Sequence, residues 1–217
     1  MKPFSKKWPA LILLMHLSSP APAAQECPLV GPNYLMDPDF ALESKDPLSP
    51  HWKAMMHAGA DAYRTEIAEG ELTIRKIAPQ EWFNYQQRVS VADKHGVKMA
   101  FSAELKLDMK PPADALFSID PSGGLDITVR SASDRIIWSS ERNHEPRLGK
   151  TEWEKVQVVF VVPARAQKLD LGFTHYADGT LQVRKPSFRK VDETAGPCPV
   201  TPDRSSSYEN YEETPLR

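Results

Sequence analysis

Apolar and polar residues alternate with a period of two through most of the stretch between Ala62 and Phe188. Phe101–Asp108 is the clearest example, with an apolar residue at every second position. Successive side chains of a strand point to opposite faces of a sheet, so this alternation predicts strands with one buried face, as in antiparallel sheets. The pattern recurs in Leu125–Arg130, Val156–Val162 and Leu169–Phe173 and, in shorter form, in Leu72–Ile74, Val89–Val91, Ile136–Trp138 and Leu181–Val183.

Turn-forming residues separate these segments, for example at Pro121–Gly124 and Ala177–Gly179. Eight or nine short strands without intervening helices predict an all-β fold, a two-sheet antiparallel β-sandwich. His51–Ala60 is the only segment that tolerates a helix, and it has room for a single turn. We expect the sandwich to occupy residues 24–192, a length of roughly 165 residues that can build its own core.

The first 23 residues have the layout of a secretory signal peptide. Three lysines precede the apolar run Trp8–Leu17, and Ala21–Ala23 supplies the small-residue exit. The run is too short for a membrane span, which needs about 20 apolar residues, and no other segment is long and apolar enough. We therefore expect cleavage after Ala23, with Ala24 as the second choice, and a product that is periplasmic or secreted.

Export changes the meaning of the two cysteines. In an oxidising compartment, a disulfide between Cys27 and Cys198 is a simpler interpretation than a pair of thiols. Glu26, directly before Cys27, disfavours lipidation of that cysteine. Residues 193–217 are too polar to fold alone, so we expect a C-terminal tail that is anchored through Cys198 and disordered beyond it.

The charge and the motifs exclude several function classes. A formal net charge of −2 argues against a protein dedicated to polyanions such as nucleic acids. The chain has no nucleophile elbow, P-loop, dinucleotide fingerprint or H-E-x-x-H helix. His175 beside Tyr176 resembles the proton-transfer pair of jelly-roll polysaccharide lyases, but the other lyase signatures are missing. We expect no enzyme, and an enzyme acting on polysaccharide remains the third hypothesis.

Four motifs in order resemble the carbohydrate-binding modules of families 4, 9 and 22. They are the opening Asn33–Phe40, the passage Gln86–Val91 with Gly96–Lys106, the strand Thr151–Pro163, and the closing Leu181–Phe188. The resemblance covers about Asn33 to Val191. It implies a galactose-binding-like jelly roll whose members bind carbohydrate across the concave sheet without catalysis.

The resemblance fails at the calcium site of that family. Members carry paired acidic residues in the closing strand, where this chain has Arg184 and Lys185, and Ala41 stands where an acidic ligand is common. Calcium requires carboxylate and carbonyl oxygens, and neighbouring cations oppose it. We therefore expect no metal or other cofactor, and the Cys27–Cys198 bridge could staple the same end of the sandwich.

Sugar binding requires flat aromatic faces and planar polar side chains. Val89 and Val91 are expected to point inward, which places Trp82, Gln86 and Arg88 on the outer face of their strand. The same reasoning turns further polar side chains outward, and together they form the predicted ligand-binding set: Trp82, Gln86, Arg88, Glu104, Thr128 and Arg130.

Other interpretations of these residues stay open. Trp82 is either a binding platform or a hydrophobic plug, and Trp153 is expected in the core. The charged members could form a solvated, mutually paired face. The same face could instead hold a protein of the cell envelope, so the alternative to a glycan ligand is a structural or assembly protein with a protein partner.

Overall fold

The computed structural model describes residues 26–41, 52–56, 61–112, 122–139 and 147–200, which form twelve strands and no helix. The strands are β1 (Leu29–Val30), β2 (Lys53–Met56), β3 (Tyr63–Ala68), β4 (Glu71–Lys76), β5 (Phe83–Ser90), β6 (Lys98–Lys110), β7 (Gly123–Arg130), β8 (Ile136–Ser139), β9 (Gly149–Lys150), β10 (Glu154–Val161), β11 (Lys168–His175) and β12 (Asp178–Val191).

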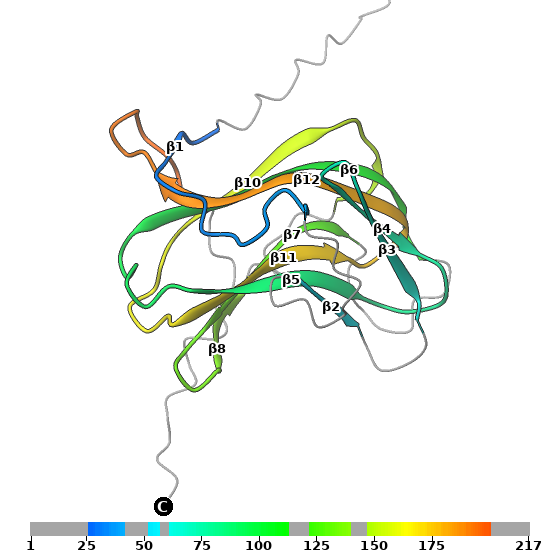
Figure 1. Ribbon diagram of the computed structural model, residues 1–217, viewed down its shortest axis with the longest axis horizontal. Helices are drawn as coiled ribbons and strands as arrows, with labels where there is room; N and C mark the ends of the chain where they lie inside the picture. Colours follow the sequence, from blue (N-terminus) through cyan, green and yellow to red (C-terminus); the bar gives the residue numbers. More distant parts are fainter. Residues whose placement is uncertain (1–25, 42–51, 57–60, 113–121, 140–146, 201–217) are drawn as a thin grey trace, which may run out of the picture.

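The strands form two antiparallel sheets that lie one over the other (Figure 1). Sheet A has the order β10-β6-β12-β4-β3, with β1 paired to β12 and β9 paired to β6. Sheet B has the order β2-β5-β11-β7-β8. The predicted all-β, two-sheet antiparallel sandwich is therefore confirmed.

The strands that sequence alternation did not find are short or lie at sheet edges. β1 and β9 contain two residues each, which is too few for a period to show. β3 is an edge strand, and every residue after Tyr63 is exposed. Its sequence therefore has no alternation that would identify a buried face. Lys53–Met56, which was expected to tolerate a helical turn, is a strand because it pairs with Phe83–Gln86 of β5.

The inward side chains of both sheets meet in one core. Its largest members without exposed surface include Phe83, Phe101, Phe173 and Phe188. Trp52 fills one region of this core and stacks on Tyr85, with ring centroids 5.7 Å apart and an angle of 6° between the planes. A large apolar core of this kind provides most of the stability of a sandwich.

The segment before Phe40 is held between the two sheets by two side-chain amides. Asn33 accepts hydrogen bonds from the backbone of Phe188 and Leu35, at 2.9 and 3.2 Å. Gln87, which points inward from β5 and is buried, bonds both the N–H and the C=O of Met36, at 2.9 and 3.1 Å. Buried backbone groups of this irregular segment thus find partners that no sheet provides.

A second, small apolar cluster lies on the outer face of sheet A at the end of β12. It consists of Cys27, Ala100, Val159, Val191 and Cys198, with Leu29 against it. The predicted disulfide between Cys27 and Cys198 is present and closes this cluster, with the two Cα atoms 5.5 Å apart.

The proposed signal peptide at residues 1–23 lies outside the described residues, as does the tail from residue 201 onward. Within the described part of the chain, no helix has the length and apolarity needed to cross a membrane.

Candidate functional site

The outward side chains of the three central strands of sheet B form a continuous polar surface. Cross-strand pairing aligns Arg88 with Asp170 and Thr128, and Gln86 with Gly172 and Asp126. None of the outward residues of these strands is a large apolar one: they are Asn84, Gln86, Arg88 and Ser90 of β5, Lys168, Asp170, Gly172 and Thr174 of β11, and Gly124, Asp126, Thr128 and Arg130 of β7. We call these twelve residues the polar face of sheet B.

Several side chains of the polar face are buried although they point away from the core. Asp126, Asp170 and Thr174 are each 2 % exposed, and Thr128 is 8 % exposed. Polar side chains on the solvent side of an antiparallel sheet are ordinarily exposed, because water is their best partner. These four side chains therefore form a buried polar layer on the outer side of sheet B.

Asp170 lies at the centre of this layer, between two arginines from the neighbouring strands. Arg88 donates two hydrogen bonds to the Asp170 carboxylate, at 2.6 and 3.0 Å, and Nε of Arg130 donates a third. Burial raises the pKa of Asp170, but the hydrogen bonds from both arginines outweigh burial and hold that pKa below its ordinary value. Asp170 thus stays ionised and holds both guanidinium groups in place.

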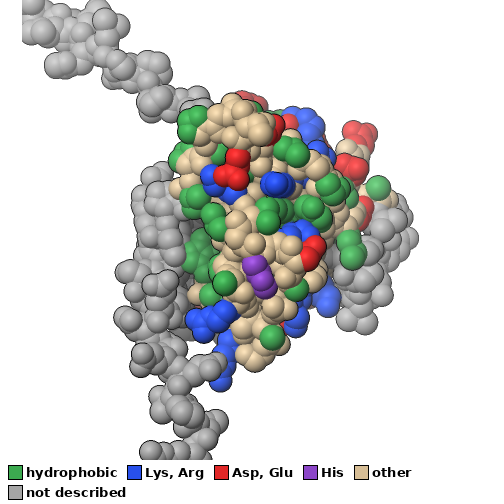
Figure 2. All heavy atoms as spheres, turned by 90° about the vertical axis from the view of Figure 1, so that its left-hand side faces the viewer, with side chains coloured by type: hydrophobic (Ala, Val, Ile, Leu, Met, Phe, Trp, Pro, Cys, Tyr) green, Lys and Arg blue, Asp and Glu red, His purple; other side chains and the backbone are tan. Residues whose placement is uncertain are grey.

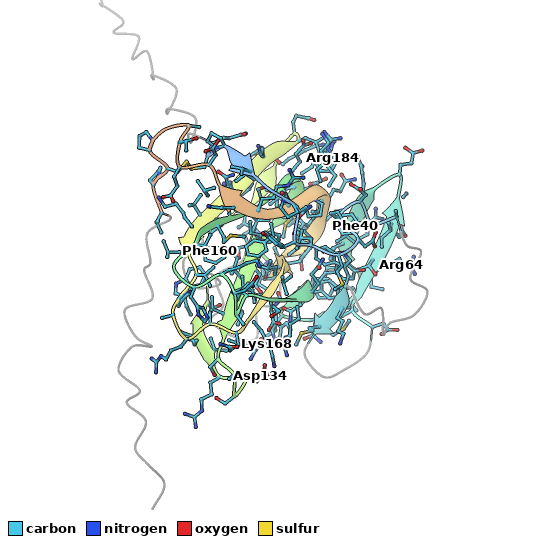
Figure 3. All side chains as sticks on the ribbon, turned by 60° about the vertical axis from the view of Figure 1, so that its left-hand side comes forward. Phe40, Arg64, Asp134, Phe160, Lys168 and Arg184 are labelled. Atoms are coloured by element: carbon cyan, nitrogen blue, oxygen red, sulfur yellow. A yellow bond between two sulfur atoms is a disulfide. The ribbon has the colours of Figure 1, made fainter. Side chains whose placement is uncertain are left out.

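Asp134, in the turn between β7 and β8, supplies a second carboxylate to the same cations. One carboxylate oxygen lies 3.2 Å from Nη1 of Arg88 and 3.5 Å from Nζ of Lys168. The backbone carbonyl of Asp134 accepts a hydrogen bond of 3.0 Å from Nη1 of Arg130. Figure 3 shows Asp134 and Lys168 side by side at the end of sheet B.

Beyond this charged cluster, Asn84 and Thr174 place two further buried oxygen atoms on the polar face. Asn84 and Thr174 are directly paired across β5 and β11. Among the described residues, neither Oδ1 of Asn84 nor Oγ1 of Thr174 has a hydrogen-bond partner. A buried polar atom of this kind implies a water or a ligand group as its partner.

The structure brings four of the six predicted site residues together. Gln86, Arg88, Thr128 and Arg130 all lie on the polar face of sheet B. Trp82 precedes β5 and is half-buried at the start of that strand. Their role in ligand binding stays a prediction.

Glu104 does not share this face. It lies on β6 in sheet A, on the side away from the core, where Arg184 and Lys185 bind its carboxylate at 2.5 and 2.8 Å. In Figure 3, Arg184 lies far from Asp134 and Lys168, on the opposite side of the sandwich. The prediction that Glu104 and Arg88 belong to one surface was wrong because strand parity gives the face of a sheet but not which sheet a strand joins.

One tryptophan also differs from expectation. Trp153 was expected in the core but lies outside it, with the Arg184 guanidinium 4.1 Å above its ring. Trp138 packs against the core and stacks on Phe160 at 5.8 Å. An aromatic floor is thus missing from the polar face, whose twelve residues include no aromatic side chain.

His175 and Tyr176, the pair with a resemblance to lyase residues, are buried. His175 has no exposed surface, and Tyr176 is 5 % exposed. Burial lowers the pKa of His175 to about 4, so the imidazole is neutral near pH 7. Its Nε2 lies 3.2 Å from the Gly179 carbonyl, and its ring packs edge-on against Tyr63. These contacts hold the His175 ring in the interior of the protein.

Sequence reasoning missed Asp170, Lys168 and Asp134. The alternation of Leu169, Leu171 and Phe173 could have placed Asp170 outward, since it stands between two inward residues. Its position between two arginines depends on pairing across three strands, which alternation does not specify. Across the described ranges, no three His, Cys, Asp or Glu side chains are arranged to hold a metal ion.

No protein-family model and no curated protein matches the chain. Solved structures match its fold. The tailspike protein 4 enzymatically active domain of Bacteriophage CBA120 has a TM-score of 0.53 and 11% identity, over 73% of this chain and 21% of that one. A CBM4 structure has a TM-score of 0.45 and 11% identity, over 73% and 97% of the two chains. The CBM22-1 xylan-binding domain from Paenibacillus barcinonensis Xyn10C has a TM-score of 0.43 and 13% identity, over 65% and 86%. At these identities the likeness concerns the β-sandwich fold alone.

Proposed function

We propose that the protein is an exported, non-catalytic β-sandwich module that binds a carbohydrate on the polar face of sheet B. The observation that carries this proposal is the pair of buried oxygen atoms on the polar face, Oδ1 of Asn84 and Oγ1 of Thr174, neither of which has a hydrogen-bond partner among the described residues. The hydroxyl groups of a carbohydrate can supply these partners, because each hydroxyl both donates and accepts hydrogen bonds. The sequence motifs that resemble carbohydrate-binding modules support the same function.

A protein partner on this face is the alternative. Interfaces between proteins have apolar centres enriched in aromatic side chains and depleted of charge. The polar face has no such apolar centre, because Arg88, Asp170 and Arg130 lie there. The absence of an apolar centre argues against a protein partner of this kind, and a carbohydrate would be held by polar side chains, since none of the twelve residues of the face is aromatic.

Affinity electrophoresis on a panel of soluble polysaccharides tests the proposal, with xylan, mixed-linkage β-glucan, galactan and polygalacturonate in separate gels. Gln86→Ala removes an amide from the polar face, and Gln182→Ala makes the same change on the outer face of sheet A. Wild type is expected to be retarded by at least one polysaccharide. Gln86→Ala should weaken that binding about fivefold, the effect of losing one hydrogen bond, while Gln182→Ala leaves it unchanged. Absence of retardation in every gel, or equal effects of the two substitutions, would contradict the proposal.

Export is the part of the proposal that depends on residues 1–23. We expect the protein recovered from the producing cells to begin at Ala24, and mass spectrometry of its N-terminal peptide measures this. An N-terminus that retains Lys2 would contradict a cleaved signal peptide.

A further inference from the structure

The charges on the polar face of sheet B are arranged in two layers. The acidic side chains of the face, Asp126 and Asp170, form its floor and are each 2 % exposed. The cationic side chains reach further out, with side-chain exposures of 44 % for Arg88, 39 % for Lys168 and 21 % for Arg130. Blue Lys and Arg side chains lie on the lower part of the molecule in Figure 2. The β7–β8 hairpin lies at the same height in Figure 1.

The buried carboxylate balances only one of the two arginines that it holds. Asp170 orients both Arg88 and Arg130 through hydrogen bonds. Lys168, one pair further along the same strand, lies opposite Arg130 and adds a third positive charge. Three cations thus lie at this end of the face, and the one buried carboxylate there binds only the two arginines, so a second anion is favoured beside them.

The exposed carboxylate of Asp134 already occupies that position. It is half-exposed at 49 % and lies against both Arg88 and Lys168. This contact demonstrates that the two cations can receive one carboxylate together, with the planar guanidinium as a matching donor. Asp134 belongs to a turn at the edge of the face, so an anion from outside can replace its carboxylate without disturbing β5 or β11.

We propose that the carbohydrate bound on this face is acidic, and that its carboxylate or sulfate group takes the place of the Asp134 carboxylate against Arg88 and Lys168. The inference rests on the proposed carbohydrate-binding function and specifies its ligand class. The formal net charge of −2 excludes a basic excess over the whole chain, so the recognition is local to this end of the polar face. Asp134 acts as an internal competitor that lowers the affinity for the acidic ligand.

Substitution of Asp134 provides the sharpest test. Asp134 has a φ of 65°, a left-handed conformation that asparagine accepts well, so Asp134→Asn removes the charge and preserves the turn. Lys168→Gln removes one of the receiving cations. Glu152→Gln is the matched control, because it makes the same change of net charge at a side chain that is 89 % exposed and pairs with Lys106 of sheet A.

Binding is measured by isothermal titration calorimetry with two pairs of polysaccharides: polygalacturonate against its fully methyl-esterified form, and dextran sulfate against dextran. The two members of each pair have the same polysaccharide backbone and differ only in their anionic groups. Comparison of the two pairs distinguishes a preference for carboxylate from a preference for sulfate. We expect tighter binding of the acidic member in at least one pair. Asp134→Asn should strengthen that binding about threefold to fivefold and Lys168→Gln should weaken it by a similar factor, while Glu152→Gln changes nothing.

The two proposals fail in different ways. If wild type binds neutral polysaccharides of the earlier panel but prefers neither acidic member, the acidic ligand class is wrong and carbohydrate binding stands. The acidic class is also wrong if Asp134→Asn and Glu152→Gln have equal effects. If wild type binds no polysaccharide in either electrophoresis or calorimetry, both proposals are wrong.

Discussion

Arg88 and Asp170 lie directly opposite each other on β5 and β11, and two hydrogen bonds of 2.6 and 3.0 Å join the guanidinium to the carboxylate. The same carboxylate binds Arg130 from β7, on its other side. One buried acidic residue therefore connects the three central strands of sheet B on the face that we assign to the ligand. This triad places two cations around one carboxylate on that face.

Asp170→Asn should reduce the free energy of unfolding by about 2 to 4 kcal/mol, because it leaves two arginines without their buried counter-ion. The loss is smaller than for a wholly buried triad, since Arg88 is 44 % exposed and solvent screens it. Urea unfolding followed by circular dichroism measures the change. Asp134→Asn, on the exposed turn, serves as the control and should cost less than about 1 kcal/mol. Equal stability of the two variants would show that the triad adds little to the fold.

Gly172→Ala tests the close approach of β11 to β5. A Cβ at residue 172 would lie 2.4 Å from the Tyr85 carbonyl oxygen and 2.6 Å from Cβ of Gln86. Because backbone must move to relieve this overlap, we expect a loss of about 2 kcal/mol or more in the free energy of unfolding. Gly124→Ala makes the same change on the same face, where a Cβ meets no atom within 4 Å. Thermal unfolding should distinguish the two variants, and a Gly172→Ala protein as stable as Gly124→Ala would contradict the contact.

Stability should fall between pH 6.5 and pH 4 through His175. Burial lowers the pKa of this residue to about 4 in the folded protein, compared with 6.5 in the unfolded chain. Between these values the unfolded chain binds a proton that the folded protein does not, so acidification favours unfolding, by up to about 3 kcal/mol at pH 4. Urea unfolding of wild type and His175→Gln across this range measures the contribution as the difference in slope. Parallel pH profiles for the two proteins, or an NMR titration of His175 with a midpoint near 6.5, would contradict it.

Reduction of the Cys27–Cys198 disulfide should lower the free energy of unfolding by about 2 to 4 kcal/mol. The bond closes a loop over a sequence separation of 171 residues and seals the small cluster with Ala100, Val159 and Val191. The double variant Cys27→Ser with Cys198→Ser should match the reduced protein in urea unfolding. Its far-UV circular dichroism should stay that of a β-sheet protein, because the main core lies between the sheets and does not include the bond. A reduced protein as stable as the oxidised one would mean that the cluster holds without the bond.

Much of the fold could be predicted because the alternation of apolar and polar residues within a strand shows which of its faces is buried. The alternation in Phe101–Asp108 and Leu125–Arg130 identified β6 and β7 and the side chains that each turns to the core. Alternation did not identify Lys53–Met56, a strand only by its pairing with β5. Short edge strands depend on a neighbour for their hydrogen bonds, so their own residues carry little signal.

The candidate site was predicted in part for the same reason. Parity alone turned Gln86, Arg88, Thr128 and Arg130 outward, and the structure places all four on one face. Trp153 was assigned to the core from its motif, yet it lies beneath the Arg184 guanidinium on the outer side of sheet A. A cation and an aromatic ring from distant segments can pack together at a surface. The residues next to Trp153 in the sequence do not indicate that Arg184 lies against its ring.

The sequence by itself determined the class of fold, the direction in which most strands face, and the pairing of its two cysteines, because each depends on local periodicity or on there being one possible pair. The tertiary structure alone decided which strands share a sheet. Long-range pairing in register separated Glu104 from Arg88 by the thickness of the sandwich, and it placed Asp170 between Arg88 and Arg130. Register and sheet membership follow from the packing of the whole core, so the charge pattern of the polar face exists only in the folded chain.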